Sequence, residues 1–160
     1  MVLKSKIIFF FITALIAFSL ISCEKNKNDV IPDVWVDFTM DLVNDTEFSD
    51  LAAIGNHVIV TYQTNNYGAK AAGFDSSGII VYRSLTEEFN AYDRTCPHDY
   101  AVNALRIKVN VDFTIAICPK CSTNYALSAF GTPISGPGRY PLKNYKTSFN
   151  GQILHVWNSY

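Results

Sequence analysis

Three cysteines and one histidine are the residues best suited to carry chemistry. They occur in two short groups, Cys96-Pro97-His98 and Cys118-Pro119-Lys120-Cys121, so the spacing is C-x-H-x19-C-x2-C. Thiolates and imidazoles are the ligands that soft metal ions and iron-sulfur clusters take. A disulfide framework favours an even number of cysteines, and the three that remain when Cys23 of the N-terminal segment is set aside would leave one unpaired. The spacing therefore predicts two neighbouring loops that direct Cys96, His98, Cys118 and Cys121 toward one metal centre.

The segments around these residues resemble the Rieske [2Fe-2S] domain family over about residues 51–157. Residues 78–83 and 88–98 resemble the hairpin that leads into the family's first cluster loop, and Cys118-Pro119 resembles its second loop. The following segment, including a proline-bearing loop over the cluster, is matched by Gly131-Thr132-Pro133, Ser135-Gly136-Pro137-Gly138 and Pro141-Leu142. The resemblance implies an all-β fold, an antiparallel sandwich or barrel with a two-loop subdomain that binds a [2Fe-2S] cluster.

The same resemblance implies a set of cluster ligands. Cys96 and Cys118 would hold one iron and His98 the outer iron, while Cys121 stands where the family has its second histidine. A thiolate in place of a neutral imidazole adds negative charge beside the iron and stabilises the oxidised state. We therefore predict a reduction potential below the upper part of the Rieske range, which is roughly −150 to +300 mV.

Four further positions complete the comparison with the family. Thr123 and Tyr125 align with a hydroxyl residue and a tyrosine that hydrogen-bond the bridging sulfide and a ligand sulfur in high-potential relatives. Tyr100 and Ser122 stand where the family has small glycines. The resemblance thus adds Thr123 and Tyr125 to the cofactor-binding residues, and it predicts loops that depart from the family's at Tyr100 and Ser122.

The sequence leaves the nature of the bound group open. Folded proteins that carry clusters are exported by the twin-arginine route, and Lys4-Ser5-Lys6 is not a twin arginine. A chain exported unfolded has free thiols, which could bind zinc in a closed site of three thiolates and one imidazole. Alternatively Cys118 and Cys121 could form a disulfide, with Cys96 and His98 as the remains of a lost site.

Two functions from different classes fit these residues. The first, which is favoured over a stand-alone enzyme, is one-electron transfer by a Rieske-like module that works with a redox protein partner and needs no small-molecule substrate. The second is a non-catalytic envelope lipoprotein whose Rieske-like domain, stapled by zinc or free of metal, serves interaction or assembly. Nucleic-acid binding is not expected, because a formal net charge of −1 provides no basic surface for phosphates.

Strands are the elements expected to position the two loops. From residue 34 onward, short β-branched and aromatic runs alternate with Gly, Asn, Asp and Pro, which is typical of all-β domains. The Asn150-Gly151 pair predicts a type I′ hairpin turn, in which both central residues have positive φ. One helical turn is expected at residues 50–54. The predicted strands are residues 34–38, 57–62, 78–83, 89–93, 105–109, 113–117, 145–149 and 152–157.

The N-terminal segment predicts export and lipid anchoring. Lys4 and Lys6 precede an apolar run over residues 7–21, which is the layout of a signal peptide. A spanning helix needs roughly 20 apolar residues, and Leu20-Ile21-Ser22-Cys23 resembles a bacterial lipobox. We therefore expect anchoring to a membrane of the cell envelope, on the periplasmic or outer-membrane side. The predicted parts are a signal peptide at residues 1–22, a polar tether at 23–33 that begins with lipidated Cys23, and one Rieske-like domain at 34–160.

Overall fold

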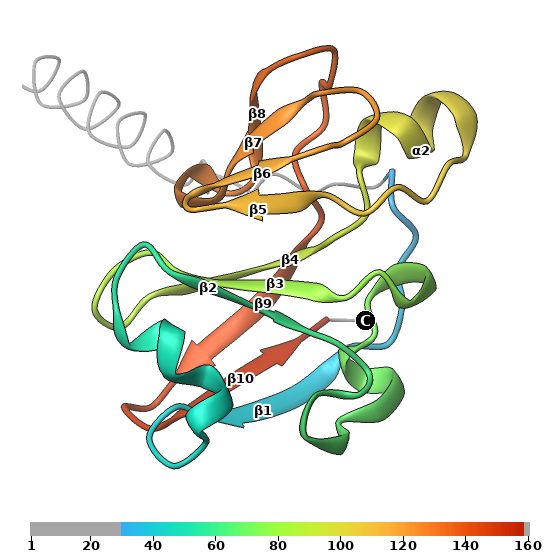
Figure 1. Cartoon of the computed structure of the whole chain (residues 1–160). Coiled ribbons are helices and arrows are strands. Elements are labelled where there is room, and N and C mark those ends of the chain that lie inside the picture. Colours follow the sequence, from blue (N-terminus) through green and yellow to red (C-terminus); the bar gives the residue numbers. More distant parts are fainter. Residues whose placement is uncertain (1–29, 159–160) are drawn as a thin grey trace, which may run out of the picture.

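The computed structural model describes residues 30–158, which form two antiparallel β-sheets (Figure 1). The larger sheet has six strands in the order β1-β10-β9-β4-β3-β2, and the smaller has four in the order β5-β6-β7-β8. The larger sheet consists of β1 (Asp37–Asp41), β2 (His57–Val60), β3 (Ile79–Arg83), β4 (Phe89–Asp93), β9 (Asn144–Phe149) and β10 (Ile153–Trp157). The smaller consists of β5 (Asn110–Asp112), β6 (Ile115–Ile117), β7 (Asn124–Ala126) and β8 (Thr132–Ser135).

Helical segments are short throughout the described residues. Helix α2 (Pro97–Asn103) follows β4 and lies beside the smaller sheet, in the upper part of Figure 1. The remaining turns are 3-10 helices at Thr46–Ala52, Thr64–Asn66, Gly68–Ala71, Phe74–Ser76 and Leu127–Ala129.

Strand β3 is buried on both faces and separates two hydrophobic cores. Successive side chains of a strand point to opposite faces, so Ile79 and Val81 join one core while Ile80 and Tyr82 join the other. The first core belongs to the six-stranded sheet. The second core also contains Tyr92, Cys96, Val109, Ala116, Cys118, Tyr125, Leu127 and Leu142. Two of the predicted ligands are therefore part of the packing of the second core.

The predicted all-β architecture is confirmed, and most of the predicted strands are present. The β3–β4 hairpin runs from the pair Ile79 and Asp93 to the pair Arg83 and Phe89, and it delivers the chain to Cys96. The strands predicted at residues 113–117, 145–149 and 152–157 correspond to β6, β9 and β10, within two residues at each end. The predicted helical turn overlaps the 3-10 helix Thr46–Ala52.

The strand predicted at residues 105–109 is wrong. In this segment Lys108 makes an isolated bridge to Thr95, and the next strand, β5, begins only at Asn110. The strand predicted at 34–38 likewise starts late, because β1 begins at Asp37. Helix α2, strands β5, β7 and β8, and the 3-10 helices that follow Ala52 were not predicted. Strand β8 contains Pro133, which a strand tolerates at the edge of a sheet.

The β9–β10 hairpin is present, but its turn is not type I′. Gly151 has a φ of 98°, whereas Asn150 is not among the described residues with positive φ. Asn150 instead closes the turn, because its side-chain oxygen accepts hydrogen bonds from the backbone N–H groups of Gln152 and Ile153 at 3.0 and 2.7 Å. The positive φ therefore falls on the first of the two central residues, Gly151 and Gln152, where a hairpin turn also favours glycine.

The predicted signal peptide and the lipidated Cys23 lie outside the described residues, and both stay predictions. The end of the predicted tether is described. There Ile31 is buried, and Asp33 forms an ion pair with Lys143 at 2.7 Å. No helix within residues 30–158 has the length and hydropathy to cross a membrane.

A buried carboxylate ties the end of β4 to its neighbours. Asp93 is fully buried and accepts hydrogen bonds from the backbone N–H of Phe74 and Thr95 at 2.6 and 2.8 Å. The hydroxyls of Ser77 and Tyr145 donate to it at 2.9 and 2.7 Å. Because Thr95 immediately precedes Cys96, these bonds fix the first loop at its start.

Replacing Asp93 with alanine should destabilise the protein strongly. The substitution removes the acceptor of four hydrogen bonds in a mostly buried network, and each buried donor left unsatisfied costs about 1 to 3 kcal/mol. We expect the free energy of unfolding to fall by at least about 3 kcal/mol in denaturant titrations. Asp112→Ala on exposed β5 is the control and should change it by less than about 0.5 kcal/mol. Equal effects of both substitutions would contradict this role of Asp93.

Candidate metal centre

Two loops at the edge of the second core carry the candidate ligands. The first joins β4 to α2, and it is held by a hydrogen bond from the backbone N–H of Cys96 to the carbonyl of Ile107 at 2.7 Å. The second joins β6 to β7. It is a tight turn. The N–H of Cys118 donates to the carbonyl of Thr123 at 2.9 Å, and the N–H of Ser122 donates to the carbonyl of Cys118 at 3.0 Å.

Both positions at which the family has glycine have a local explanation. Ser122 has a φ of 58°, a left-handed conformation that favours glycine. Tyr100 instead lies within α2, and its ring packs edge-on against Phe74 with centroids 5.2 Å apart. The second loop thus keeps a glycine-like backbone, whereas Tyr100 belongs to the helix that follows the first loop.

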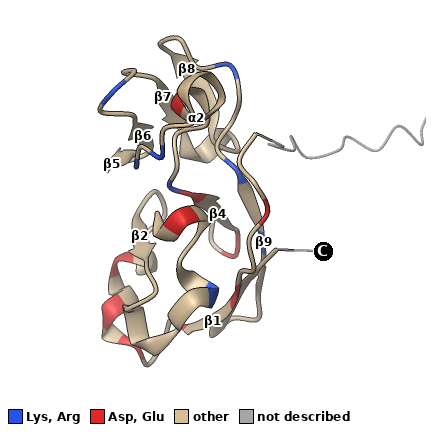
Figure 2. Ribbon diagram, turned by 90° about the vertical axis from the view of Figure 1, so that its right-hand side faces the viewer, with Lys and Arg blue, Asp and Glu red and all other residues tan. Residues whose placement is uncertain are grey.

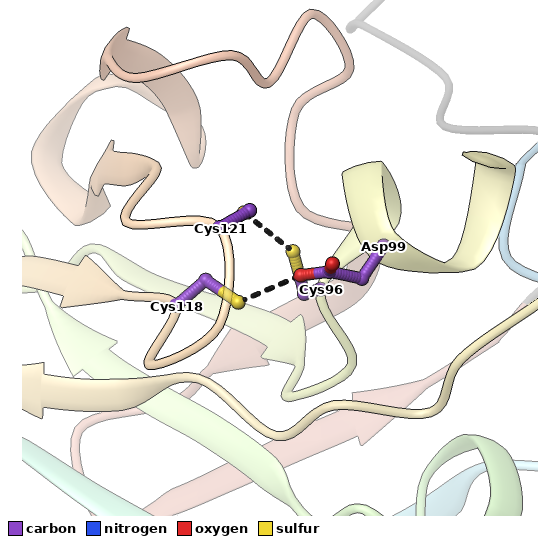
Figure 3. Close-up of side chains that lie close together, drawn as sticks. All are labelled: Cys96, Asp99, Cys118 and Cys121. Carbon is purple, nitrogen blue, oxygen red and sulfur yellow. Dashed lines mark hydrogen bonds between the residues drawn. The ribbon is translucent and has the colours of Figure 1, made fainter. Parts of the chain in front are cut away.

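Three thiols and one carboxylate converge between these loops (Figure 3). Ligand atoms of Cys96, Asp99, Cys118 and Cys121 all lie within 4.8 Å of one another. The sulfurs of Cys96 and Cys121 are 3.7 Å apart, and the Cys118 thiol donates a hydrogen bond to Oδ2 of Asp99 at 3.0 Å. The three predicted cysteines therefore meet at one point.

His98 is not part of this group. It is half-buried on the first turn of α2. The group contains two residues from this part of the chain, Cys96 and Asp99. The assignment of His98 as a ligand stays a prediction. Asp99 was missed because the resemblance directs attention to the histidine of the C-x-H pair. An acidic residue next to that pair was the only signal in the sequence that could have found it.

Thr123 and Tyr125 both contact the ligand sulfurs. The Tyr125 hydroxyl lies 3.4 Å from the Cys96 sulfur, and the Cys121 thiol donates to the Thr123 hydroxyl at 3.2 Å. Both residues are fully buried. The structure thus places these two hydroxyls where each could donate a hydrogen bond to a thiolate.

A glycine-bearing loop after β8 covers the site. The N–H of Gly138 donates to the Thr123 hydroxyl at 2.9 Å. A Cβ on Gly138 would lie 2.5 Å from the Thr123 methyl and 3.1 Å from the Tyr125 hydroxyl. A Cβ on Gly136, whose φ is 85°, would lie 2.7 Å from the Thr123 Cα. Only glycine therefore allows this loop to close over Thr123.

Burial keeps the Cys96 and Cys118 thiols protonated in the absence of a metal. It raises the pKa of the Cys96 thiol to about 11, and burial together with the bond to Asp99 raises the pKa of Cys118. Burial also acts to raise the pKa of Asp99, but hydrogen bonds from the three thiols and the charge of His98 outweigh it, so this pKa is lowered. A metal that binds here must displace protons from sulfur.

The donor set suits a thiophilic metal. All three cysteines are free thiols, and the sulfurs of Cys96 and Cys121 are 3.7 Å apart. A tetrahedral zinc with bonds of about 2.3 Å to sulfur has sulfurs about 3.8 Å apart, close to the observed 3.7 Å. Three thiolates and a fourth donor also meet the requirement of a [2Fe-2S] cluster for four ligands. The residues therefore fit either group.

Comparisons with solved structures identify similar chains that belong to Rieske and ferredoxin proteins. One is a chain from a complex of reduced oxygenase and oxidized ferredoxin in carbazole 1,9a-dioxygenase, with 17% identity, 78% of this chain and 94% of that chain covered, and a TM-score of 0.48. The ferredoxin of carbazole 1,9a-dioxygenase from Nocardioides aromaticivorans IC177 has 14% identity, coverage of 79% and 100%, and a TM-score of 0.46.

A third similar structure is the plasma membrane Rieske protein PetC3 from Synechocystis PCC 6803. It has 21% identity, coverage of 62% of this chain and 97% of that chain, and a TM-score of 0.43. No protein-family model and no curated protein matches the sequence.

Proposed function

We propose that this protein is a one-electron carrier whose [2Fe-2S] cluster is held by Cys96, Cys118, Cys121 and a fourth ligand. The observation that carries the proposal is the convergence of three thiols from two loops on one buried point. Thiolates are the main ligands of iron-sulfur clusters, and this arrangement leaves no sulfur committed to a disulfide.

The residues of the chain have separate tasks in such a carrier. The bound cluster would take up and release one electron. Cys96 and Cys118 are fully buried, so the second core excludes water from their side of the site. The hydroxyls of Thr123 and Tyr125 would donate hydrogen bonds to the sulfurs, and the Gly136 to Gly138 loop holds Thr123 in place.

The distribution of charge supports an acidic redox partner. Residues 94–143, which include the two loops and the smaller sheet, contain six basic and two acidic residues, whereas the rest of the described chain contains three basic and ten acidic residues. Figure 2 shows the same division, with most of the blue segments around β5 to β8 and most of the red ones around the larger sheet. Opposite charges on two proteins speed their encounter and favour one orientation. A partner with an acidic face would therefore meet the end of the protein that carries the metal centre.

A single structural metal ion, with zinc as the first candidate, is the second proposal. The observation that favours it is compactness, because all four ligand atoms lie within 4.8 Å. In a [2Fe-2S] cluster two irons and two sulfides separate the two ligand pairs, so one pair lies farther from the other than donors around one ion do. A closed zinc site would stabilise the fold, and the protein would then serve interaction rather than electron transfer.

Metal and sulfide analysis of the mature protein from its native envelope separates these proposals. Iron and acid-labile sulfide in equal amounts, with an electron paramagnetic resonance signal on reduction, would support the carrier. Zinc without sulfide would support the structural ion. Neither metal in freshly isolated protein would refute both proposals.

Location at the cell envelope is a further part of the proposal. It rests on the lipobox-like Leu20-Ile21-Ser22-Cys23 and on the apolar run before it. Metabolic labelling with a radioactive fatty acid tests it. We expect label on the wild-type protein and none after Cys23→Ser, and an unlabelled wild-type protein would contradict lipid anchoring.

Replacing Tyr125 with phenylalanine should lower the reduction potential. Hydrogen bonds to cluster sulfurs help to set the potential, and a donated bond favours the reduced state, whose sulfurs carry more negative charge. If the bond is worth about 1 kcal/mol more in the reduced state, the midpoint falls by about 40 mV. A redox titration followed by visible spectroscopy measures this shift.

Tyr92→Phe is the matched control for this measurement. Tyr92 is fully buried in the same core, but its hydroxyl donates to the carbonyl of Leu127 at 2.5 Å. We expect this variant to lose stability and keep its potential. The same potential in the wild type and in Tyr125→Phe would show that the Tyr125 hydroxyl does not act on the cluster.

A further inference from the structure

We propose that Asp99, and not His98, supplies the fourth donor atom of the metal centre. This inference rests on the proposed function in one respect, namely that the three thiols bind a metal or cluster. Oδ2 of Asp99 lies 3.0 Å from the Cys118 sulfur, and a carboxylate oxygen of Asp99 is within 4.8 Å of the ligand atoms of all three cysteines. Figure 3 shows the Asp99 side chain reaching from α2 toward the cysteines.

Helix geometry explains why Asp99 replaces His98. Cys96 immediately precedes α2, and Pro97 begins it, as proline does at the first position of many helices. The N–H of Tyr100 donates to the carbonyl of Cys96 at 3.2 Å, which closes the first turn. Neighbouring residues of an α-helix point about 100° apart, so the turn that directs Asp99 at the thiols turns His98 away from that direction. The turn directs Asp99 inward.

Asp99 is buried beside the thiols, with no basic side chain of the described chain paired to it. Its side chain belongs to a residue that is only 3% exposed. A buried carboxylate is costly unless a positive charge or several hydrogen bonds compensate it. Among the described residues, Asp99 forms no ion pair with Lys, Arg or His, and its closest polar neighbours are thiols. A metal that takes the protons of these thiols removes the hydrogen bonds that compensate the carboxylate, and the cation then supplies the compensating charge.

The resulting donor set is three thiolates and one carboxylate, which carries one more negative charge than three thiolates and a neutral imidazole. Cys96 immediately precedes α2, Asp99 lies in its first turn, and Cys118 and Cys121 lie on the turn between β6 and β7. The site therefore needs no rearrangement of the helix, whereas ligation by His98 would require the first turn of α2 to unwind or rotate.

Cobalt substitution in the full mature chain tests the ligand set. Co²⁺ bound by thiolates absorbs in the visible range, and the positions of its bands depend on the other donors. We compare the wild type with Asp99→Ala and His98→Ala, and we measure Co²⁺ and Zn²⁺ affinity by competition with a chelator. Asp99→Ala should weaken binding by at least about tenfold, since even outer partners of metal ligands are worth that much, and should shift the bands. His98→Ala should change the affinity by less than about threefold and leave the bands in place.

A second measurement keeps the test independent of folding. In protein that carries a reduced cluster, pulsed electron paramagnetic resonance should detect no imidazole nitrogen in the wild type. Asp99→His should introduce such a nitrogen signal, and His98→Ala should leave the spectrum unchanged. Imidazole coupling in the wild type that disappears in His98→Ala would overturn the assignment of Asp99.

The outcomes separate this inference from the function on which it rests. A wild type that binds Co²⁺ and Zn²⁺ through thiolates, but depends on His98 and not on Asp99, would refute the ligand assignment alone. A wild type that shows no thiolate absorption with Co²⁺ and isolates without iron or zinc would refute the metal centre, and the assignment with it.

Discussion

Replacing Cys118 with serine is expected to abolish metal binding and to lower the thermal stability of the holoprotein. Cys118 is fully buried, and its sulfur contacts the Asp99 carboxylate at 3.0 Å. A serine hydroxyl is a poor ligand for thiophilic metals, so the site would keep two sulfurs at most. Because the free energy of metal binding adds to that of folding, the loss of the metal should also lower the melting temperature. Metal content per chain and calorimetric melting measure the two effects.

Ala116→Ser is the matched control for this substitution. Ala116 is also fully buried in the second core, on strand β6 just before the cysteine loop. The Ala116→Ser substitution introduces the same hydroxyl into the same core, so it should lower the stability of the protein without releasing the metal. If Cys118→Ser retained the full metal content of the wild type, the convergence of thiols would have no role in metal binding. If Ala116→Ser lost the metal as well, the effect would reflect folding alone.

The sequence was most informative where the pattern of residues is local. Strand β4 follows from an alternating run bounded by turn residues, and the structure has the predicted bounds, Phe89–Asp93. The convergence of Cys96, Cys118 and Cys121 could also be predicted, because the C-x2-C spacing fits a tight turn and the preceding hairpin delivers Cys96 beside it. These features depend on short stretches of chain and on few long-range contacts.

Asp99 and the other unpredicted elements depend on context that a single sequence does not contain. Helix α2 has only seven residues, which is too short for a clear helical period. Strands β7 and β8 have three and four residues, and they exist because they extend the small sheet beyond β6. The choice between His98 and Asp99 depends on whether Cys96 is followed by an extended loop or by a helix. That choice is made by packing, here including the contact of Tyr100 with Phe74.

Replacing Cys121 with histidine is expected to raise the reduction potential of the cluster. Cys121 is the half-buried member of the group, 3.7 Å from the Cys96 sulfur, so it can be exchanged with little change to the core. A neutral imidazole in place of a thiolate removes one negative charge beside the iron, which makes the reduced state less costly. All-cysteine plant-type clusters lie near about −400 mV and Rieske centres between about −150 and +300 mV. Exchange of one of the ligands that distinguish the two cluster types should cover part of the gap between them. We therefore expect the reduction potential of Cys121→His to rise by on the order of 100 mV.

Lys120→His separates the effect of ligation from that of an added imidazole. Lys120 is exposed and adjacent to Cys121, so the variant places an imidazole on the same turn outside the ligand set and removes a positive charge. Its potential should stay the same or fall slightly. In Cys121→His, by contrast, ligation by the new imidazole would raise the potential and would also make it depend on pH where that imidazole titrates. A Cys121→His variant that keeps its iron and sulfide but shows no rise would mean that the Cys121 sulfur does not bind iron in the wild type. The cluster would then have to be held by Cys96, Cys118 and donors from α2.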